Sequence, residues 1–407
     1  MRLFDLSADG LFGDPFSLMQ PLSLSQKPPA FPLAIVGSGI MGALSALTAA
    51  QLGLRVLWFG PPEADRTDGA DARNYALSPA TVGLLKRLGV WPALEANSCA
   101  VTRMEVFSGA SRVDLTASDS GAEFLSTMVT HRSLLDVLEQ ALKFCAPVAR
   151  VPARPTGLEI FPDHVRLSVE EKTFDAQLVL GADGARSWVR GQAGILWGQR
   201  DYGQQAIVAA FSTEFPHGGV AAQWFDRGDI LALLPLADPQ QVSMVWSCSR
   251  TDPLTPDLTA TIADQISDRT AMRFGQLRLE GGLTAAPLRM LLTDELTATR
   301  IALLGDAAHT VHPLAGYGLN LGVQDLLCLE TLWKEYRSDP GSGAALNFYR
   351  RQRQRHIKTV QWSLDFLQRW VVQSHPTLQR FSQAGLRLVA NTGLLRQLLI
   401  RQAMGPY

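Results

Sequence analysis

The chain has 407 residues, of which 46% are hydrophobic and 18% charged, and its formal net charge is −1 at pH 7. The length is too great for one ordinary hydrophobic core and predicts two domains, while the composition is that of a soluble globular protein. Four cysteines, Cys99, Cys145, Cys248 and Cys328, form no C-x-x-C motif. This excludes an obvious zinc site, so no metal is predicted, and it favours a reducing cytosol.

The charge is distributed unevenly along the chain. Between Gly341 and Tyr407, ten lysine and arginine residues stand against one acid, Asp365, so this segment carries +9 and the preceding residues carry −10. Such asymmetry favours a cytoplasmic protein whose C-terminal region docks peripherally on an anionic membrane surface or on an acidic protein partner. The alternative is an ordinary solvated helical face. Nucleic acid is disfavoured as a partner because the acidic body would repel it.

Residues 1–31 show no sustained apolar stretch before a small-residue cleavage site, and we interpret them as an N-terminal extension and not as a signal peptide. Residues 28–54 carry no charge, a length that could imitate a membrane span. Three glycines within six residues, together with Pro32, argue against one continuous helix there. A transmembrane segment is therefore not predicted.

A strand at 33–36, a Gly-rich turn, a small-residue helix and a strand at 55–59 follow one another. In the turn, Gly37 permits the reversal, Gly39 lets the backbone approach a pyrophosphate, and Gly42 lets helix and strand pack closely. This order of elements predicts dinucleotide binding. An acid that binds the ribose hydroxyls is expected at the end of the second strand, but that position holds Gly60.

Two arginines follow in positions suited to phosphate oxygens, which a guanidinium can bind through two parallel hydrogen bonds. Arg73 lies in the segment DARNYALS at 71–78, before an amphipathic helix at 81–88. Residues 102–115 alternate like strands, and Arg132 precedes a helix predicted at 133–144. The alternative for Arg73 is a surface ion pair with Asp71.

Two acids follow predicted strands directly. The strand at 174–180, preceded by one at 165–169, runs into Asp183-Gly184, and the strand at 301–304 runs into Gly305-Asp306. Ligands of open α/β sheets bind outside the carboxyl ends of the strands. Both carboxylates are therefore candidate ligand contacts, although a plain strand-turn-helix with a chance acid is the alternative.

The loop after Asp306 contains Pro313, Gly316 and Gly318, and a helix is predicted from Leu319 onward. Such a loop presents bare backbone N–H groups to a planar or anionic ligand. Between 197 and 291 the pattern changes to β, with strands predicted at 205–212, 221–225, 230–236 and 242–247, and we interpret this segment as a substrate domain. From Asp325 the pattern is helical, with breaks at 339–341 and 375–376.

Three motifs occur in this order: Gly37-Ser-Gly39-Ile-Met-Gly42, Asp183-Gly184 and Gly305-Asp306. Together they resemble the motifs of the single-component flavoprotein aromatic hydroxylases with the hydroxybenzoate-hydroxylase fold. DARNYALS at 71–78, HTVHPLAGYGLNLG at 309–322 and the stretch from 225 to 247 narrow the resemblance to the ubiquinone-biosynthesis hydroxylases. The resemblance covers residues 32–407. It implies an α/β fold, with a Rossmann-like FAD-binding domain, an inserted β-sheet substrate domain and C-terminal helices.

The resemblance also implies a division of the chain and a chemistry. The implied segments are an extension (1–31), the FAD-binding domain (32–196, with part of the substrate domain at about 101–129), the substrate domain (197–291), a last FAD-binding segment (292–335) and a basic helical region (336–407). The implied activity is an NAD(P)H- and dioxygen-dependent monooxygenase that hydroxylates a prenylated phenol of ubiquinone biosynthesis through a flavin hydroperoxide. In such an enzyme the protein positions the substrate against the flavin and excludes water from the reacting atoms.

The resemblance assigns site residues as well. Gly37, Gly39 and Gly42 would approach the pyrophosphate, Arg73, Arg132 and Asp183 would lie along the FAD, and Asp306 would bind the ribityl chain. Pro313 and the backbone of Gly316, Gly318, Leu319 and Asn320 would border the isoalloxazine ring, with Pro313 and Tyr317 at the reacting centre. The helix start at Leu319 would stabilise negative charge on the reduced flavin.

Two residues depart from the family pattern. Gly60 replaces the ribose acid, so that FAD is expected to bind weakly and Gly60→Glu to tighten it, unless Glu63 or Asp65 acts instead. Tyr317 stands where these hydroxylases usually have Gln. The alternatives left open are a hydroxylase of small soluble phenols and a flavin-free prenyl-binding module of related fold. A flavin halogenase is disfavoured because no W-x-W-x-I-P motif occurs.

Overall fold

The computed structural model describes residues 31–61, 73–109, 111–226, 228–249, 256–310 and 317–367. The helices are α1 (Ile40–Gln51), α2 (Pro79–Arg87), α3 (Trp91–Glu95), α4 (His131–Lys143), α5 (Trp188–Gln192), α6 (Pro256–Arg269), α7 (Tyr317–Glu335) and α8 (Gly343–Leu367). The first strands are β1 (Phe31–Val36), β2 (Val56–Phe59), β3 (Asn74–Leu77), β4 (Cys99–Val101), β5 (Arg103–Ser108), β6 (Ser111–Thr116), β7 (Ser126–Thr130), β8 (Val148–Val151), β9 (Gly157–Ile160), β10 (Val165–Val169) and β11 (Lys172–Gly181). The others are β12 (Trp197–Thr213), β13 (Val220–Asp226), β14 (Asp229–Pro235), β15 (Gln241–Cys248), β16 (Leu277–Thr293), β17 (Thr297–Ala298), β18 (Ile301–Leu303) and β19 (His309–Thr310).

The first sheet has the order β17-β18-β11-β1-β2-β8, with β10 and β9 attached beside β11. Strands β18, β11, β1, β2 and β8 run parallel. Most residues of β1 and all residues of β2 and β18 are buried, as expected for the inner strands of a parallel sheet covered by helices. Because the strands are parallel, Val36, Phe59, Gly181 and Leu303 end at the same edge, and the predicted ligand motifs all begin there.

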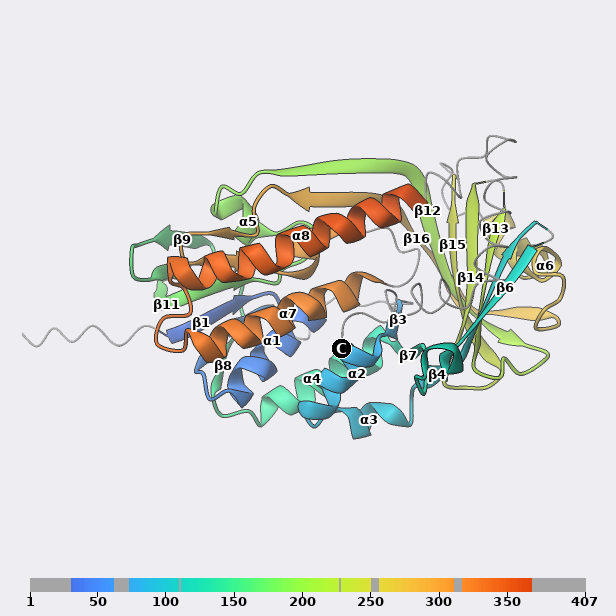
Figure 1. Ribbon diagram of the computed structural model, residues 1–407, viewed down its shortest axis with the longest axis horizontal. Helices are drawn as coiled ribbons and strands as arrows, with labels where there is room; N and C mark the ends of the chain where they lie inside the picture. The colour runs from blue at the N-terminus through green and yellow to red at the C-terminus, as the bar shows by residue number, and fades with distance from the viewer. Residues whose placement is uncertain are drawn as a thin grey trace, which may run out of the picture.

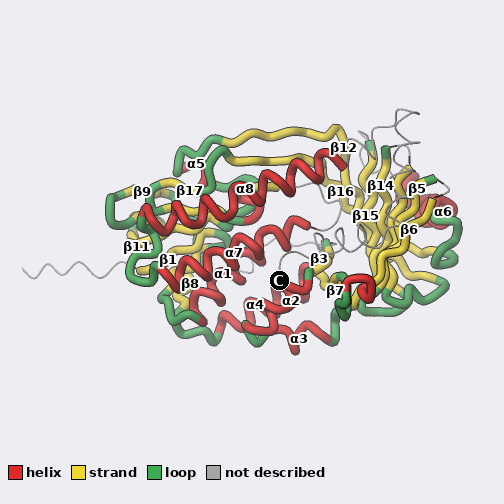
Figure 2. Tube along the Cα trace, viewed as in Figure 1, coloured by secondary structure: helices red, strands yellow, loops and turns green. Residues whose placement is uncertain are grey.

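Helices cover this sheet. The small side chains of α1 let ten of its twelve residues be buried, and α1 packs against α4 and α7. Helix α8 lies beside α7, with α1 on the other side of α7 (Figure 2). Among the described residues, no helix is long and apolar enough to cross a membrane.

The second sheet has the order β19-β16-β12-β15-β14-β13-β5-β6. Its strands alternate, so that one row of side chains forms a core with α6, which lies on the outer face of the sheet (Figure 1). The opposite row faces the first sheet. Strands β12 and β16 have 17 residues each and run from the first sheet into the second (Figure 1). A small third sheet, β3-β7-β4, lies between the two larger ones.

The structure confirms the predicted α/β class and the strands of the second sheet, and it corrects several boundaries. Strand β1 begins at Phe31, within the predicted extension, whose other residues lie outside the described part. Helix α4 begins at His131 because Thr130 caps it by accepting a hydrogen bond from the backbone of Ser133. Strand β16, which the sequence analysis missed, contains the pair Gly281-Gly282. Of the segment 101–129, only β5 and β6 join the second sheet.

Candidate functional site

A cavity of about 1470 Å³ lies between the carboxyl edge of the first sheet and the inner face of the second. Pockets for one small-molecule ligand usually measure about 300–1000 Å³, so this volume has room for two ligands. Three predicted strand-end motifs and one predicted helix start line it. They contribute Gly37 and Gly39, Asp183, Asp306, and the helix start from Gly318 to Asn320.

The Gly-rich turn has the close contacts that its glycines predict. Gly37 has φ +129°, and a Cβ there would lie 2.2 Å from the carbonyl oxygen of Ala182. A Cβ on Gly42 would lie 1.9 Å from the oxygen of Gly37, so α1 can pack this closely only with glycine. Trp58 donates to that same oxygen at 2.8 Å. Above Gly39 nothing lies within 4 Å of an added Cβ, and the N-terminus of α1 faces open space in the cavity.

The structure argues against the prediction that Gly60→Glu would tighten the cofactor, because that prediction did not take account of the space at residue 60. A Cβ on Gly60 would lie 2.3 Å from Cβ of Ser38, a distance that real Cβ atoms do not adopt. Residue 60 is therefore glycine because residue 38 has a side chain. Glu63 and Asp65, the suggested substitutes, lie outside the described residues.

The two carboxylate oxygens of Asp183 have different environments. Its Oδ2 accepts hydrogen bonds from the backbone of Trp188 (2.7 Å) and Val189 (3.1 Å), at the start of α5. Its Oδ1 is buried and has no hydrogen-bond partner among the described residues. A buried acceptor of this kind suits a ligand with a hydroxyl or amide donor.

Asp306 follows β18 directly and exposes its side chain to the cavity. Burial by the surrounding protein raises the pKa of Asp306, and the positive charges of His309 and Arg73 oppose that effect. The carboxylate is thus surrounded by protein but open to the cavity, and it lies close to two basic groups. A ligand hydroxyl in the cavity could donate a hydrogen bond to it, which would favour its ionised form.

The start of α7 approaches the same cavity. Gly318, Leu319 and Asn320 line it, and both side-chain polar atoms of Asn320 make hydrogen bonds within the protein. Oδ1 of Asn320 accepts from the backbone of Ser78 (2.9 Å) and from the hydroxyl of Thr81 (2.8 Å), and its Nδ2 donates to the oxygen of Ala76 (2.8 Å). These bonds hold the side chain of Asn320 against the segment from Ala76 to Thr81. Pro313 and Gly316 lie outside the described residues; α7 begins at Tyr317, whose side chain lies outside them too.

Three arginines, Arg73, Arg154 and Arg186, line the cavity on the side of the first sheet. The predicted Arg132 does not. It is the second residue of α4, and its side chain pairs along the helix surface with Asp136 at 2.9 Å, as i,i+4 neighbours do. The structure therefore gives Arg132 no place beside the other candidate residues, whereas its neighbour His131 does line the cavity.

The inner face of the second sheet forms an apolar wall. Among the described residues of this sheet that line the cavity, none is charged. Those residues are Met104, Leu115, Ala206, Val208, Ala221, Ala222, Gln223, Ile230, Ala232, Leu234, Val245, Ser247, Thr284, Ala286, Leu288 and Thr310. Several are alanines, whose short side chains leave space between this wall and the edge of the first sheet.

Several lining groups were missed by sequence reasoning. The hydroxyl of Tyr75 lies 3.0 Å from Nδ1 of His131, a pair that can pass a proton along the cavity wall. The amide of Asn74 donates to the hydroxyl of Ser243 at 2.9 Å and joins the third sheet to the second. No local pattern marks these residues, because each pair is far apart in sequence.

Residues 31–363 match the family described as FAD binding domain. The chain is 33% identical over 405 residues to ubiquinone hydroxylase UbiL of Rhodospirillum rubrum, across 97% of this chain and 94% of that protein. The chain belongs to the FAD-dependent ubiquinone-biosynthesis hydroxylases. This hydroxylase is also 32% identical to 3-demethoxyubiquinol 3-hydroxylase of Escherichia coli, across 92% of this chain and 98% of that protein.

Solved structures show the same fold at lower identity. The p-nitrophenol 4-monooxygenase PnpA of Pseudomonas putida superposes with a TM-score of 0.77 at 17% identity, across 91% of this chain and 96% of that one. HpxO of Klebsiella pneumoniae, crystallised with FAD and uric acid, gives a TM-score of 0.71 at 18% identity, across 90% and 97%. These structures show the fold, while the FAD-binding family and the ubiquinone-hydroxylase relatives show a flavoprotein monooxygenase. The cavity has features that suit FAD: an open helix N-terminus, arginines and carboxylate acceptors.

Proposed function

We propose that this hydroxylase introduces one oxygen atom from dioxygen into the ring of a prenylated phenol on the way to ubiquinone, with NAD(P)H as electron donor. The observation that supports the substrate class is the uncharged wall of the second sheet. A small soluble phenol that bears a carboxylate would need a cationic partner on this wall, and the described wall offers none. An isoprenoid tail needs only apolar surface.

The residues of the first sheet would hold the cofactor. Gly37, Gly39 and the N-terminus of α1 would bind the pyrophosphate, with Arg73 as counter-charge, and Asp183 and Asp306 would accept hydrogen bonds from hydroxyl groups. FAD supplies the oxygen-transfer chemistry once reduced. Of the remaining predicted contacts, Gly42 would act by packing α1 onto the turn, and Arg132 is the weakest candidate because its side chain is held by Asp136.

The start of α7 would face the reactive ring. Backbone N–H groups from Gly318 to Asn320 would stabilise negative charge there, as a helix N-terminus does. Pro313, Gly316 and Tyr317 would complete this border. The apolar wall would exclude water from the reacting atoms, and the pair Tyr75–His131 would hold or release a proton at the cavity wall.

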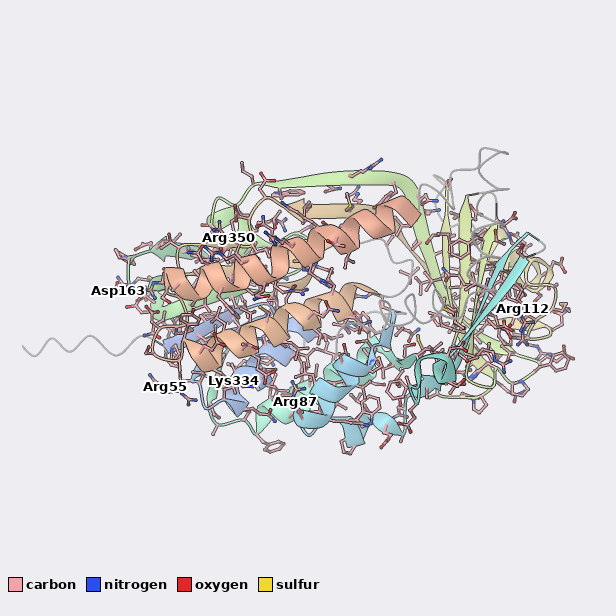
Figure 3. The ribbon with its side chains drawn as sticks, viewed as in Figure 1. Arg55, Arg87, Arg112, Asp163, Lys334 and Arg350 are labelled. Atoms are coloured by element: carbon pink, nitrogen blue, oxygen red, sulfur yellow. The ribbon has the colours of Figure 1, made fainter. Side chains whose placement is uncertain are left out.

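The C-terminal region would place the enzyme at its substrate. On α8, Arg351, Arg355 and Lys358 are exposed and spaced i, i+4 and i+7, so they form a basic stripe on one side of the helix. Arg350, by contrast, lies on the edge of α8 turned away from α7 and pairs with Glu295 at 3.3 Å (Figure 3). We propose that the stripe faces an anionic membrane surface, from which a prenylated substrate could be drawn.

The test is mass spectrometry of quinone intermediates in cells that lack this protein and have no second hydroxylase for the same step. We expect ubiquinone to fall and a prenylated phenol one oxygen poorer than the product to accumulate. Wild-type protein should restore ubiquinone, and Asp306→Ala should restore it poorly. Normal ubiquinone in the deletion strain, together with NAD(P)H oxidation driven by tail-less phenols in vitro, would contradict the proposal.

A further inference from the structure

The turn that carries Asp306 is held from behind by a buried carboxylate. Oδ2 of Asp325, on α7, accepts hydrogen bonds from the backbone N–H of Gly305 (3.0 Å) and from Nε2 of His309 (2.7 Å). Oδ1 accepts from Nε of Arg353, on α8, at 2.7 Å. The side chains of Asp325 and His309 are at most 1% exposed, so these bonds do not compete with water.

Two further hydrogen bonds fix the same segment. Arg190, on α5, donates to the carbonyl oxygen of Ala307 at 2.8 Å, on the other side of Asp306 from Gly305. Tyr349, one helical turn before Arg353, donates to the carbonyl oxygen of Leu303 at 2.7 Å. Helix α8 therefore acts on the segment in two ways. Tyr349 contacts it directly, and Arg353 acts through the carboxylate of Asp325 on α7.

Backbone packing leaves this turn little room to shift. Gly305 has φ +56°, in the left-handed region, and Cα of Gly305 would lie 3.2 Å from a Cβ on Gly322 of α7. The side chain of Met41, on α1, fills the space beside both glycines. Helix α1, the Asp306 turn and α7 thus meet at one point, so a shift of one of them would displace the others.

The surroundings of Asp325 favour its ionised form. Burial alone would raise the pKa of Asp325, but the charges of His309 and Arg353 and the hydrogen bonds from His309 and Gly305 lower it. The carboxylate is therefore ionised at neutral pH and accepts every bond named above. Removing its cationic partner would leave a buried charge uncompensated, which proteins tolerate poorly.

We propose that Asp325 is a positioning residue for the cofactor: together with Arg353 it fixes the turn from Gly305 to His309 so that the carboxylate of Asp306 faces the cavity. Helix α8 is then part of the FAD site, although its sequence is that of a basic surface helix. The inference concerns the cofactor and does not depend on which phenol is hydroxylated.

The experiment is a double-mutant cycle between Asp325→Asn and Asp306→Ala. FAD affinity is measured by quenching of flavin fluorescence, and near-UV circular dichroism of the apoprotein shows whether each variant is folded. We expect folded Asp325→Asn to bind FAD about 10-fold more weakly. The double variant should bind no more weakly than Asp306→Ala alone, because Asp325 acts through Asp306.

Arg353→Lys carries the same test if Asp325→Asn does not fold. It keeps the positive charge but loses the second N–H, which donates to the carbonyl oxygen of Leu321 at 3.3 Å. We expect a smaller loss of FAD affinity, again absent in the Asp306→Ala background. Arg350→Lys is the matched control on the same helix and should bind FAD like wild type. Wild-type affinity in a folded network variant, or losses that add to that of Asp306→Ala, would overturn the proposal.

Discussion

Asp306 should bind the cofactor and make that binding depend on pH. Removing its charge-assisted hydrogen bond should cost about 1.5–3 kcal/mol, so Asp306→Ala should weaken FAD binding about 10- to 150-fold and purify paler. Because burial raises the pKa of Asp306 while an accepted hydrogen bond favours its ionised form, FAD affinity should be full at neutral pH. It should fall as the pH drops through the raised pKa of Asp306 in the FAD-free protein.

Fluorescence titration of FAD between pH 4 and 8 measures this dependence. His309 and Arg73 are the charged groups that act on Asp306, so Asp306→Asn, which leaves both in place, is the control. The slope should disappear in that variant. A slope that survives Asp306→Asn would assign the proton to another group.

Ser38 and Gly60 form a steric pair, and each should determine what the other can be. Gly60→Glu alone should lose FAD and lower the melting temperature, because its Cβ overlaps that of Ser38. In Ser38→Gly/Gly60→Glu the closest remaining atom is Cα of Ser38 at 3.2 Å, which the backbone can relieve. The double variant should therefore recover FAD and gain a ribose acceptor, worth about 1 kcal/mol. Thermal shift and FAD titration of all four proteins measure the coupling.

Tyr317 stands where the related hydroxylases usually carry Gln. As α7 begins at Tyr317, we expect this residue to affect the reacting centre more than cofactor retention. Tyr317→Gln should change turnover, or the hydrogen peroxide released per NAD(P)H oxidised, while FAD content stays near that of wild type. Equal turnover and equal peroxide release in the two proteins would contradict a role for Tyr317 at the reacting centre.

At the scale of the element, β14 carries two functions on alternate residues. Ala232 faces the cavity, and the adjacent Leu233 is fully buried against the core beneath α6. Ala232→Phe should raise the KM for a prenylated substrate and leave FAD content unchanged. Leu233→Ala should instead lower stability by about 2–5 kcal/mol, because it leaves a cavity in the core. Denaturant unfolding and substrate titration on the same two proteins separate the effects.

Sequence reasoning was most successful for the elements in which the hydrophobic pattern and the chemistry of the motif residues agree. The strand ends with Gly37, Asp183 and Asp306 converge because parallel strands share an edge, and this follows from their order. The cavity wall could be predicted as apolar, but not its alanines as a set. The surface position of Arg132 could not be predicted, because Thr130 caps α4 and thereby places Arg132 within the helix.

Contacts between distant segments could not be predicted in this way. Asp325 is an acid within the apolar run LGVQDLL, which is a signal of a buried charge, but nothing in that run names Arg353 as its partner. Likewise the fit of Gly60 against Ser38 depends on how closely β2 approaches the turn after β1. Such pairs become visible only when the packing of whole elements is known.

At the scale of the whole molecule, the basic C-terminal region should determine where the enzyme works. Arg351, Arg355 and Lys358 should each contribute about 1 kcal/mol near an anionic bilayer, so reversing all three to Glu should reduce binding at least about 10-fold. Flotation with vesicles of phosphatidylserine and phosphatidylcholine measures it at low and high salt. Salt should weaken the wild type and leave the variant little changed.

The control for that experiment reverses three exposed lysines elsewhere, Lys86, Lys143 and Lys172, which changes net charge equally without touching the stripe. Equal losses in the two triple variants would show that overall charge, and not the stripe on α8, governs binding. Residues 368–407 contribute five more arginines, and they lie outside the described part of the chain.

The long strands β12 and β16 have a mechanical consequence. They are paired from Trp197 and Thr293 at one end to Thr213 and Leu277 at the other, with register shifts only between Asp201 and Gln205 and between Val208 and Ala210. A hydrogen-bonded ladder of this length resists being pulled apart but can flex where its register breaks. The two sheets should therefore stay joined throughout turnover, and any change in their relative orientation should be concentrated at the two register shifts.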